Sequence, residues 1–303
     1  MSIELQTLRK NHIYTAKATV SSVMADLQEI AGIDRLAELQ QSKHGKRALY
    51  YFLAIIGALL LIVVLSILKI ETTILGLGII LLLLGIFILT ILLIYELFKK
   101  IKFGRLNVIN YRYEVTQRVV QMLARDIDES SEIELTLSFK PTVTKENKAE
   151  IIPHLSKTNW KIDKYQHEWL RLKGQFLDKT RFLVTATELS KTQYGWKRGR
   201  SGKSKYKSKR NSVGLDVVLN LNYPQRRYGA VKILQNEVSN AVKLPNLSYM
   251  KGLKVTEKAM YMIVRIAPQV ADNSEEIYQT ITMMFLSFYQ VLNLAKVLSK
   301  ESR

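Results

Sequence analysis

One short segment stands out as a place where binding chemistry can occur, the basic tract between Trp196 and Arg210. Positions 197 to 210 carry eight basic residues and no acidic one. Like charges at this density repel each other and remain solvated, so the tract cannot form part of a core. Eight cations beside a phosphate surface release counterions, which makes binding steeply dependent on salt. We expect a polyanion-binding site, with a merely solubilising loop as the alternative, made of Lys197, Arg198, Arg200, Lys203, Lys205, Lys207, Lys209 and Arg210.

The rest of the chain is also basic. The formal net charge is +19, and +11 remains when the tract is left out. Arg226 and Arg227 form a second, smaller basic site. Only Trp196 and Tyr206 within the tract could stack on bases, whereas proteins that bind single strands use more aromatic side chains. Anionic lipid is therefore the expected partner, and nucleic acid is the weaker alternative.

Residue patterns for catalysis or metal binding do not occur. Gly202-Lys203-Ser204 matches the end of a phosphate loop, but Lys197 stands where that motif requires its first glycine. The chain has no cysteine, so thiolate metal sites and thiol nucleophiles are excluded. No pair among the four histidines, His12, His44, His154 and His167, has metal-ligand spacing. We expect a protein without catalytic residues, metal or cofactor, and hence not an enzyme.

Two apolar segments place the chain in a membrane. Residues 48–68 and 72–95 contain no charged side chain. A helix needs about 20 apolar residues to cross the hydrocarbon core, and each segment meets that length. Only three residues, including Lys69 and Glu71, lie between them. The sequence therefore predicts a transmembrane helical hairpin over residues 48–98.

The charges that flank this hairpin predict its orientation. Lys43, Lys46 and Arg47 precede it, and Lys99, Lys100, Lys102 and Arg105 follow it. Basic residues stay preferentially on the cytoplasmic side, so both termini are expected in the cytoplasm. The plasma membrane is the expected host.

Small residues within the spans predict close helix packing. Gly57 lies in the first span, and Gly78 and Gly85 lie seven residues apart in the second. Such residues allow neighbouring backbones to approach closely. They pack the hairpin on itself or join several chains into a homo-oligomer, which is the expected assembly. A ring of hairpins would be a channel or a membrane-disrupting effector.

The parts outside the membrane combine helices with strands. Residues 1–47 hold an amphipathic helix over 15–41, which Gly32 interrupts. Residues 99–130 predict a stalk helix with a heptad stripe that continues from the second span to near Asp128. Residues 271–303 predict a heptad helix that packs on the stalk, with pairing to copies of itself in other chains as the alternative. Polar residues interrupt this last helix, so it is not expected to be a third span, and its stripe is Ile277, Ile281, Met284, Phe288, Val291, Ala295 and Leu298.

Residues 131–270 read as a mainly-β domain. Alternating apolar residues predict an antiparallel sheet of about five strands. These strands are 132–139, 169–176, 180–188, 213–221 and 260–266, with a loop at 140–160 and a helix at 228–242. The basic tract joins two of the strands, so it is expected at the tip of a long hairpin, 196–212. The fold class is an α+β membrane protein.

These features together predict a non-enzymatic, membrane-anchored binding or scaffold protein. Its cytoplasmic basic hairpin would contact anionic lipid headgroups. A homo-oligomeric channel or effector is the alternative, and a membrane tether for nucleic acid is a weaker one.

Overall fold

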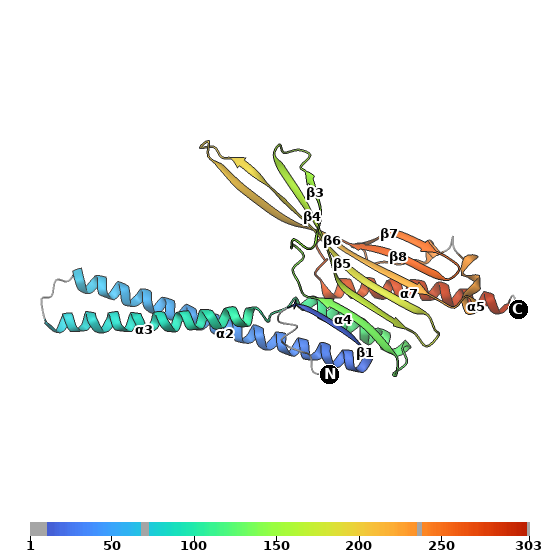
Figure 1. Ribbon diagram of the computed structural model, residues 1–303, viewed down its shortest axis with the longest axis horizontal. Coiled ribbons are helices and arrows are strands. Elements are labelled where there is room, and N and C mark those ends of the chain that lie inside the picture. The colour runs from blue at the N-terminus through green and yellow to red at the C-terminus, as the bar shows by residue number, and fades with distance from the viewer. Residues whose placement is uncertain (1–10, 68–72, 235–237, 302–303) are drawn as a thin grey trace. The chain divides into compact units, whose positions relative to one another are not determined.

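The computed structural model describes residues 11–67, 73–234 and 238–301, and it is of the α+β class (Figure 1). The chain divides into two compact units. One unit comprises Met1–Gln28 with Ile109–Arg303, and the other comprises Glu29–Val108. We call the first the sheet unit and the second the helical unit.

The sheet unit is built on one antiparallel sheet of eight strands. The strand order is β1-β2-β4-β5-β6-β8-β7, and β3 pairs with β4 beside this path. The strands are β1 (Ile13–Thr19), β2 (Glu132–Ser138), β3 (Lys148–Pro153), β4 (Trp160–Gln175), β5 (Arg181–Arg198), β6 (Ser204–Asn222), β7 (Ser248–Val255) and β8 (Ala259–Ile266).

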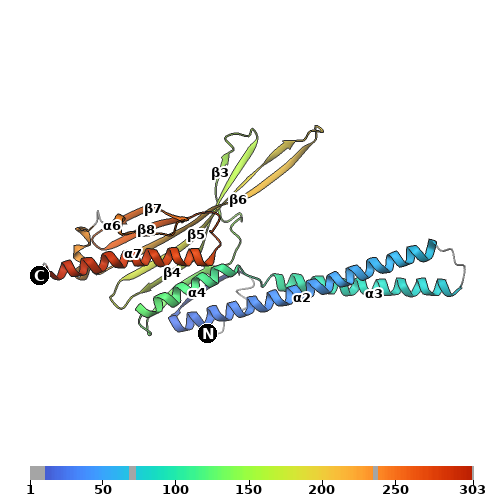
Figure 2. The same cartoon turned by 180° about the vertical axis from the view of Figure 1, so that it is seen from behind.

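Helices α4 (Asn110–Leu123) and α7 (Ser274–Glu301) cover one face of this sheet. Figure 2 shows both helices in front of the strands. The covered face carries every second residue of each strand, because strand side chains alternate between faces. In β6 these are Leu215, Val217, Leu219 and Leu221, and all four are buried. The period-two pattern in the sequence thus becomes the core.

The apolar stripe of α7 packs inside the sheet unit. Its residues Ile277, Ile281, Met284 and Phe288 are buried, and the helix contacts β6, β8 and α4. Arg118 of α4 donates to Glu275 of α7 over 2.7 Å.

Strands β4, β5 and β6 are long enough to extend beyond the helices, and they bend on the way (Figure 1). The β4–β5 register shifts between Glu168 and Leu170, and the β5–β6 register shifts between Leu189 and Ser190. Such bulges bend the bulged strand and increase its twist. We call the part beyond them the arm; it consists of β3 with residues 160–168, 188–198 and 204–212. The part below the bulges is called the body.

Gly214 lies at the junction of arm and body and requires the absence of a side chain. Its φ is +118°, and a Cβ there would lie 2.4 Å from the carbonyl oxygen of Ile266 on β8. Only glycine adopts this conformation readily and permits this close approach.

The helical unit contains most of two long helices, α2 (Val20–Ile67) and α3 (Thr73–Gly104). His44 of α2 and Glu96 of α3 lie 2.5 Å apart (Nδ1 to Oε2), and the His44 ring stacks on Phe103 at 5.5 Å. Arg47 lies 3.8 Å from the same carboxylate. The largely buried contact between His44 and Glu96 therefore joins α2 to α3.

Within the described residues, three helices are long and apolar enough to cross a membrane: Val20–Ile67, Gly76–Gly104 and Ser274–Ser299. The third was not expected to be a span, yet its length and apolar composition are sufficient for one. It also differs from the other two, because 44% of its most apolar 18-residue stretch is buried inside the protein. Its apolar stripe thus already has a partner in the sheet unit.

Several helix predictions are corrected. The helix expected over 15–41 begins only at Val20, because residues 13–19 form β1, and α2 then runs through Gly32 without interruption. The expected continuous stalk is two helices, because α3 ends at Gly104 and α4 begins at Asn110. Val108 lies in the segment between α3 and α4. Its backbone N–H donates to the buried carboxylate of Asp34 over 2.8 Å, in place of the carbonyl that would accept it within a helix.

Two further predictions in the β region change. The expected helix over 228–242 is replaced by short turns, α5 (Gln225–Tyr228), η2 (Gly229–Lys232) and α6 (Val238–Ala241). The sheet also has β1, β3 and β7 in addition to the five expected strands, and β3 lies within the predicted loop 140–160. The expected loop between the two spans falls outside the described residues.

Candidate functional site

The basic tract forms the end of the arm as a regular β-hairpin. Strands β5 and β6 pair from Arg181↔Asn222 to Arg198↔Ser204. The turn between them is closed by a 2.8 Å bond from the N–H of Gly199 to the carbonyl of Lys203, and Gly202 has a φ of +73°. Every residue from 197 to 210 is exposed. The structure therefore places all eight predicted cations of the tract on one projecting element.

Acidic side chains barely neutralise this element. Arg210 lies 3.8 Å from a Glu188 oxygen, and Arg198 donates to the carbonyl of Gly202 over 3.3 Å. Among the described residues, no other cation of the tract makes an ion pair. The neighbouring ammonium groups therefore repel each other, and binding of an external anion would reduce this repulsion.

The two faces of the hairpin have different compositions. Cross-strand partners point to the same side of a sheet. Lys205, Lys207 and Lys209 therefore share one side with their partners Lys197, Gly195 and Gln193, and we call this side the lysine face. The opposite side, which we call the aromatic face, carries Tyr194, Trp196 and Tyr206.

A groove of about 420 Å³ lies on the lysine face. Its floor is Trp160 of β4, whose ring lies against Gly195 so closely that a Cβ on Gly195 would be 2.6 Å from the indole. The indole N–H donates to the carbonyl of Trp196 over 3.2 Å, and Lys157 Nζ lies 4.5 Å from the ring centroid. The lining residues are Lys157, Trp160, Gln193, Lys197, Lys207, Ser208 and Lys209.

The aromatic face exposes two large rings near the tip. The rings of Trp196 and Tyr206 meet edge to face, with their centroids 5.6 Å apart, and the ring centroids of Tyr206 and Tyr194 are 6.1 Å apart. Trp196 is 62% exposed and Tyr206 is 55% exposed. Amphipathic rings of this kind favour the boundary between water and lipid.

Asp163 holds the strands of the arm together. Its buried carboxylate accepts hydrogen bonds from Tyr194 (3.0 Å) and Tyr165 (3.2 Å) and pairs with Lys148 at 2.5 Å. Desolvation raises the pKa of Tyr165 and Tyr194, and the neighbouring carboxylate raises it further. Both phenols therefore remain protonated donors, and β3, β4 and β5 are linked by one buried acid.

A fully buried guanidinium joins α4 to the base of the arm. Arg112 donates to the carbonyl oxygens of Ser138 (2.8 Å) and Lys140 (2.9 Å), and to Glu188 of β5 over 2.7 Å. Tyr111 donates to the same carboxylate over 3.3 Å. A buried charge is tolerated only when it is paired and hydrogen-bonded in this way.

His167 and Ser138 lie beside this cluster but lack the arrangement of a nucleophilic site. His167 Nε2 lies 3.0 Å from Ser138 Oγ, and both side chains are buried. Within the described residues His167 Nδ1 has no hydrogen-bond partner, so no carboxylate orients the ring. Burial, followed by the charge of Arg112, lowers the pKa of His167 to about 4. The imidazole is neutral at pH 7 and is part of the packing.

The second predicted basic site does not join the first. Arg226 and Arg227 lie on α5, which follows the end of β6 farthest from the tip. Arg227 lies 5.7 Å from the Tyr228 ring, and Tyr228 donates to Asp178 over 2.6 Å. These two arginines therefore belong to the body rather than to the arm.

The three predicted seam glycines make no close helix contact. A Cβ built on Gly57, Gly78 or Gly85 would have nothing within 4 Å apart from its own helix backbone and chain neighbours. A role for these glycines in packing α2 on α3, or in joining several chains, stays a prediction.

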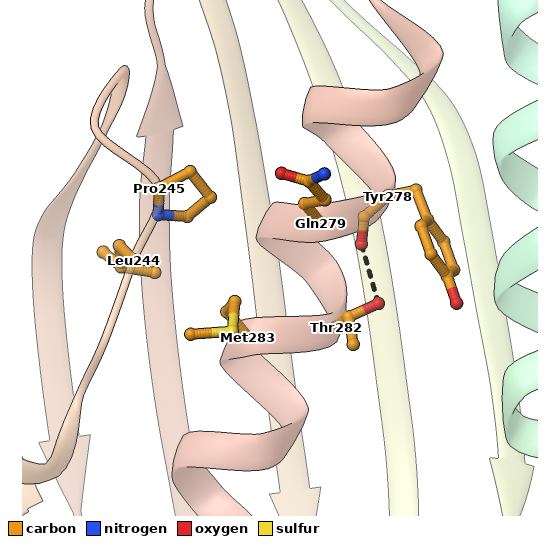
Figure 3. Close-up of a pocket in the computed structure, with 6 residues that line it drawn as sticks. All are labelled: Leu244, Pro245, Tyr278, Gln279, Thr282 and Met283. Atoms are coloured by element: carbon orange, nitrogen blue, oxygen red, sulfur yellow. Dashed lines mark hydrogen bonds between the residues drawn. The ribbon is translucent and has the colours of Figure 1, made fainter.

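A second hollow lies on the body, between α7 and the segment that precedes β7 (Figure 3). Its volume is about 280 Å³, and its walls are mostly apolar. Thr282 turns its hydroxyl back to the carbonyl of Tyr278, at 2.9 Å (Figure 3). The other lining residues are Leu244, Pro245, Gln279 and Met283.

The sequence patterns did not identify three residues of the groove, namely Trp160, Lys157 and Gln193. Trp160 was placed at the end of a polar loop, although it begins β4. Two signals were present: Gly195 interrupts a strand, which indicates a close approach by another group, and lysine alternates at positions 205, 207 and 209. The alternation indicates that these lysines share one side of a strand.

No known protein family, characterised protein or solved structure matches this chain.

Proposed function

We propose that this chain is a non-enzymatic, membrane-anchored binding protein whose arm contacts anionic lipid headgroups. The apolar helices α2 and α3 would be the anchor, with both termini in the cytoplasm because basic residues flank both predicted spans. The observation that carries the proposal is the hairpin end of the arm, where eight exposed cations face almost no neutralising acid.

The covalent link to a membrane anchor favours lipid over other polyanions. A tethered surface meets its partner at a high effective concentration, so weak contacts suffice for occupancy. Each cation near an anionic surface contributes about 1 kcal/mol of attraction. Trp196 and Tyr206 add exposed rings of the type that favours the headgroup region.

Charge reversal tests the proposal. Full-length protein in discs of neutral lipid would be mixed with phosphatidylserine vesicles, and co-sedimentation would be measured. We expect binding to be lost when Lys203, Lys205, Lys207, Lys209 and Arg210 are changed to glutamate. The matched control reverses five exposed cations elsewhere on the sheet unit, namely Lys145, Arg181, Lys243, Lys254 and Lys258.

The control changes the net charge by the same amount. If the binding site is local to the arm, the control variant should retain most of the vesicle binding. Equal losses in both variants would show that total charge alone acts and would overturn a role for the arm. Stronger binding of single-stranded DNA or RNA than of vesicles, at the same salt concentration, would replace lipid by nucleic acid as the partner.

A further inference from the structure

We infer that the groove on the lysine face binds a ligand that carries two or more phosphates clustered on a small scaffold. This inference rests on the proposed function, because it names the anion that the arm prefers. The shared chemistry is the phosphate cluster, whether it belongs to a lipid headgroup or to a soluble molecule.

The first argument is charge. Four of the seven lining residues are lysines, Gln193 adds an amide, and no acid from the described part of the chain lines the groove. Lys197, Lys207 and Lys209 lie on two paired strands and point to one side. Ammonium groups so placed repel each other, and a multivalent anion between them relieves this repulsion more than a single charge does.

The second argument is spacing. Cross-strand neighbours lie about 5 Å apart, and residues two positions apart on one strand lie about 7 Å apart. Lys207 and Lys209 are two positions apart, and Lys209 pairs with Gln193. Donors at these separations can reach different phosphates of one compact ligand. A headgroup with a single phosphate would use only some of them.

The third argument is shape. The groove of about 420 Å³ has the size of a small-molecule site, unlike a flat charged surface. The Trp160 ring gives it an apolar floor, and Gly195 fixes the ring there because any larger residue would collide with it. The indole N–H is already bonded to the Trp196 carbonyl, so the ring offers the ligand its apolar surface. A ring-shaped polyol bearing phosphates fits both the floor and the lysines.

A pair of variants separates this site from general attraction. Lys207→Gln with Lys209→Gln removes two charges from the groove. Arg200→Gln with Lys203→Gln removes two charges from the turn, outside the groove. All four side chains are exposed, so both variants keep the fold. Full-length protein in neutral discs would be titrated with inositol hexakisphosphate by calorimetry.

We expect the groove variant to lose affinity for inositol hexakisphosphate by roughly tenfold or more, and the turn variant by less than about threefold. In a second arm, vesicles would contain either phosphatidylserine or a phosphatidylinositol bisphosphate at equal surface charge. The wild type should prefer the bisphosphate vesicles, and the groove variant should lose that preference.

The outcomes separate the two proposals. Binding of phosphatidylserine vesicles, with no binding of the hexakisphosphate and no preference for the bisphosphate, would overturn the groove and leave the lipid function intact. Groove-dependent binding of the hexakisphosphate without binding to any vesicle would support the groove with a soluble ligand and overturn the lipid function. Equal losses in the two variants would also overturn the groove.

Discussion

The two ends of strands β5 and β6 share one ladder of backbone pairs but have opposite surfaces. In the body, Val184 pairs with Leu219 and Ala186 pairs with Val217, and all four are buried. In the arm, Gln193 pairs with Lys209 and Gly195 with Lys207, and both lysines are exposed. A strand ladder can therefore continue beyond the core, where its side chains serve binding rather than stability.

The change between the two ends occurs over a few residues. Glu188 is the first β5 residue of the arm and precedes the register shift between Leu189 and Ser190, and it is held by Arg112 from α4. Gly214 of β6 pairs with Leu189 at this shift. If this division is correct, substitutions at the junction and in the body should destabilise the fold, while substitutions in the arm should alter binding with little loss of stability.

The largest effect is expected for Arg112→Met. The change removes the guanidinium from the carbonyl groups of Ser138 and Lys140 and from Glu188, which keeps only the weaker contacts with Tyr111 and Arg210. Removal of one partner from a buried pair costs about 3–5 kcal/mol. Chemical unfolding of the full-length protein in detergent would measure the loss.

The matched control is Arg118→Met. Arg118 pairs with Glu275, but both side chains are substantially exposed, so removal should cost about 1 kcal/mol or less. Similar losses in the two variants would show that burial of Arg112 does not matter and would contradict the special role of the junction.

A somewhat smaller loss is expected for Gly214→Ala. The new Cβ would approach the backbone oxygen of Ile266, which cannot move without disturbing the β6–β8 pairing. The positive φ adds strain for any residue other than glycine. We expect a loss of about 2–4 kcal/mol in the free energy of unfolding. An unchanged midpoint of thermal unfolding would show that the junction is pliable.

The junction should also make stability depend on pH. The pKa of His167 is about 4 in the folded protein, because of burial and Arg112, and 6.5 ordinarily. Between these values the unfolded chain binds a proton that the folded chain does not. Stability should therefore fall as the pH decreases from 6.5 to 4, by on the order of 1 kcal/mol per pH unit at most.

His167→Gln isolates this contribution, because glutamine is uncharged and can retain a hydrogen bond to Ser138. The difference in unfolding free energy between the variant and the wild type should change with pH within that window and be constant above it. A constant difference at all these pH values would show that His167 titrates normally.

The sequence predicted those parts of the fold that depend on local periodicity. The alternation in β6 and the stripe of α7 both identified buried residues, because burial of one face imposes a period on the chain. Strands β1, β3 and β7 escaped notice, since their exposed positions dilute the pattern. Their pairing depends on neighbours that are distant in the sequence.

The candidate site divides in the same manner. The eight cations were evident from the run of basic residues in the sequence, and their place on a hairpin followed from the strands predicted on either side. The groove was not evident, because it requires Trp160 to lie beside Gly195, a contact between residues 35 positions apart. Such a contact arises from strand register, which the local sequence does not specify.

The smallest effect on stability, and the sharpest test of the comparison, is expected for Gly195→Ala. As at Gly214, the new Cβ would collide with a neighbour, here at 2.6 Å from the Trp160 ring. The neighbour is the side chain of Trp160, the first residue of β4, and rotation about its χ1 moves the ring without shifting any backbone, so the loss in unfolding free energy should be smaller than at Gly214.

Binding should respond differently, because the displaced indole is the floor of the groove. Affinity for inositol hexakisphosphate should fall although no charge has changed. Gly199→Ala is the control, since a Cβ there would make only an ordinary contact of 3.4 Å with the carbonyl of Lys203. A stability loss at Gly195 as large as that at Gly214 would mean that the arm is part of the core, and the division between the two ends would fail. Unchanged stability with weakened binding would show that one strand pair stabilises the fold at one end and recognises a ligand at the other.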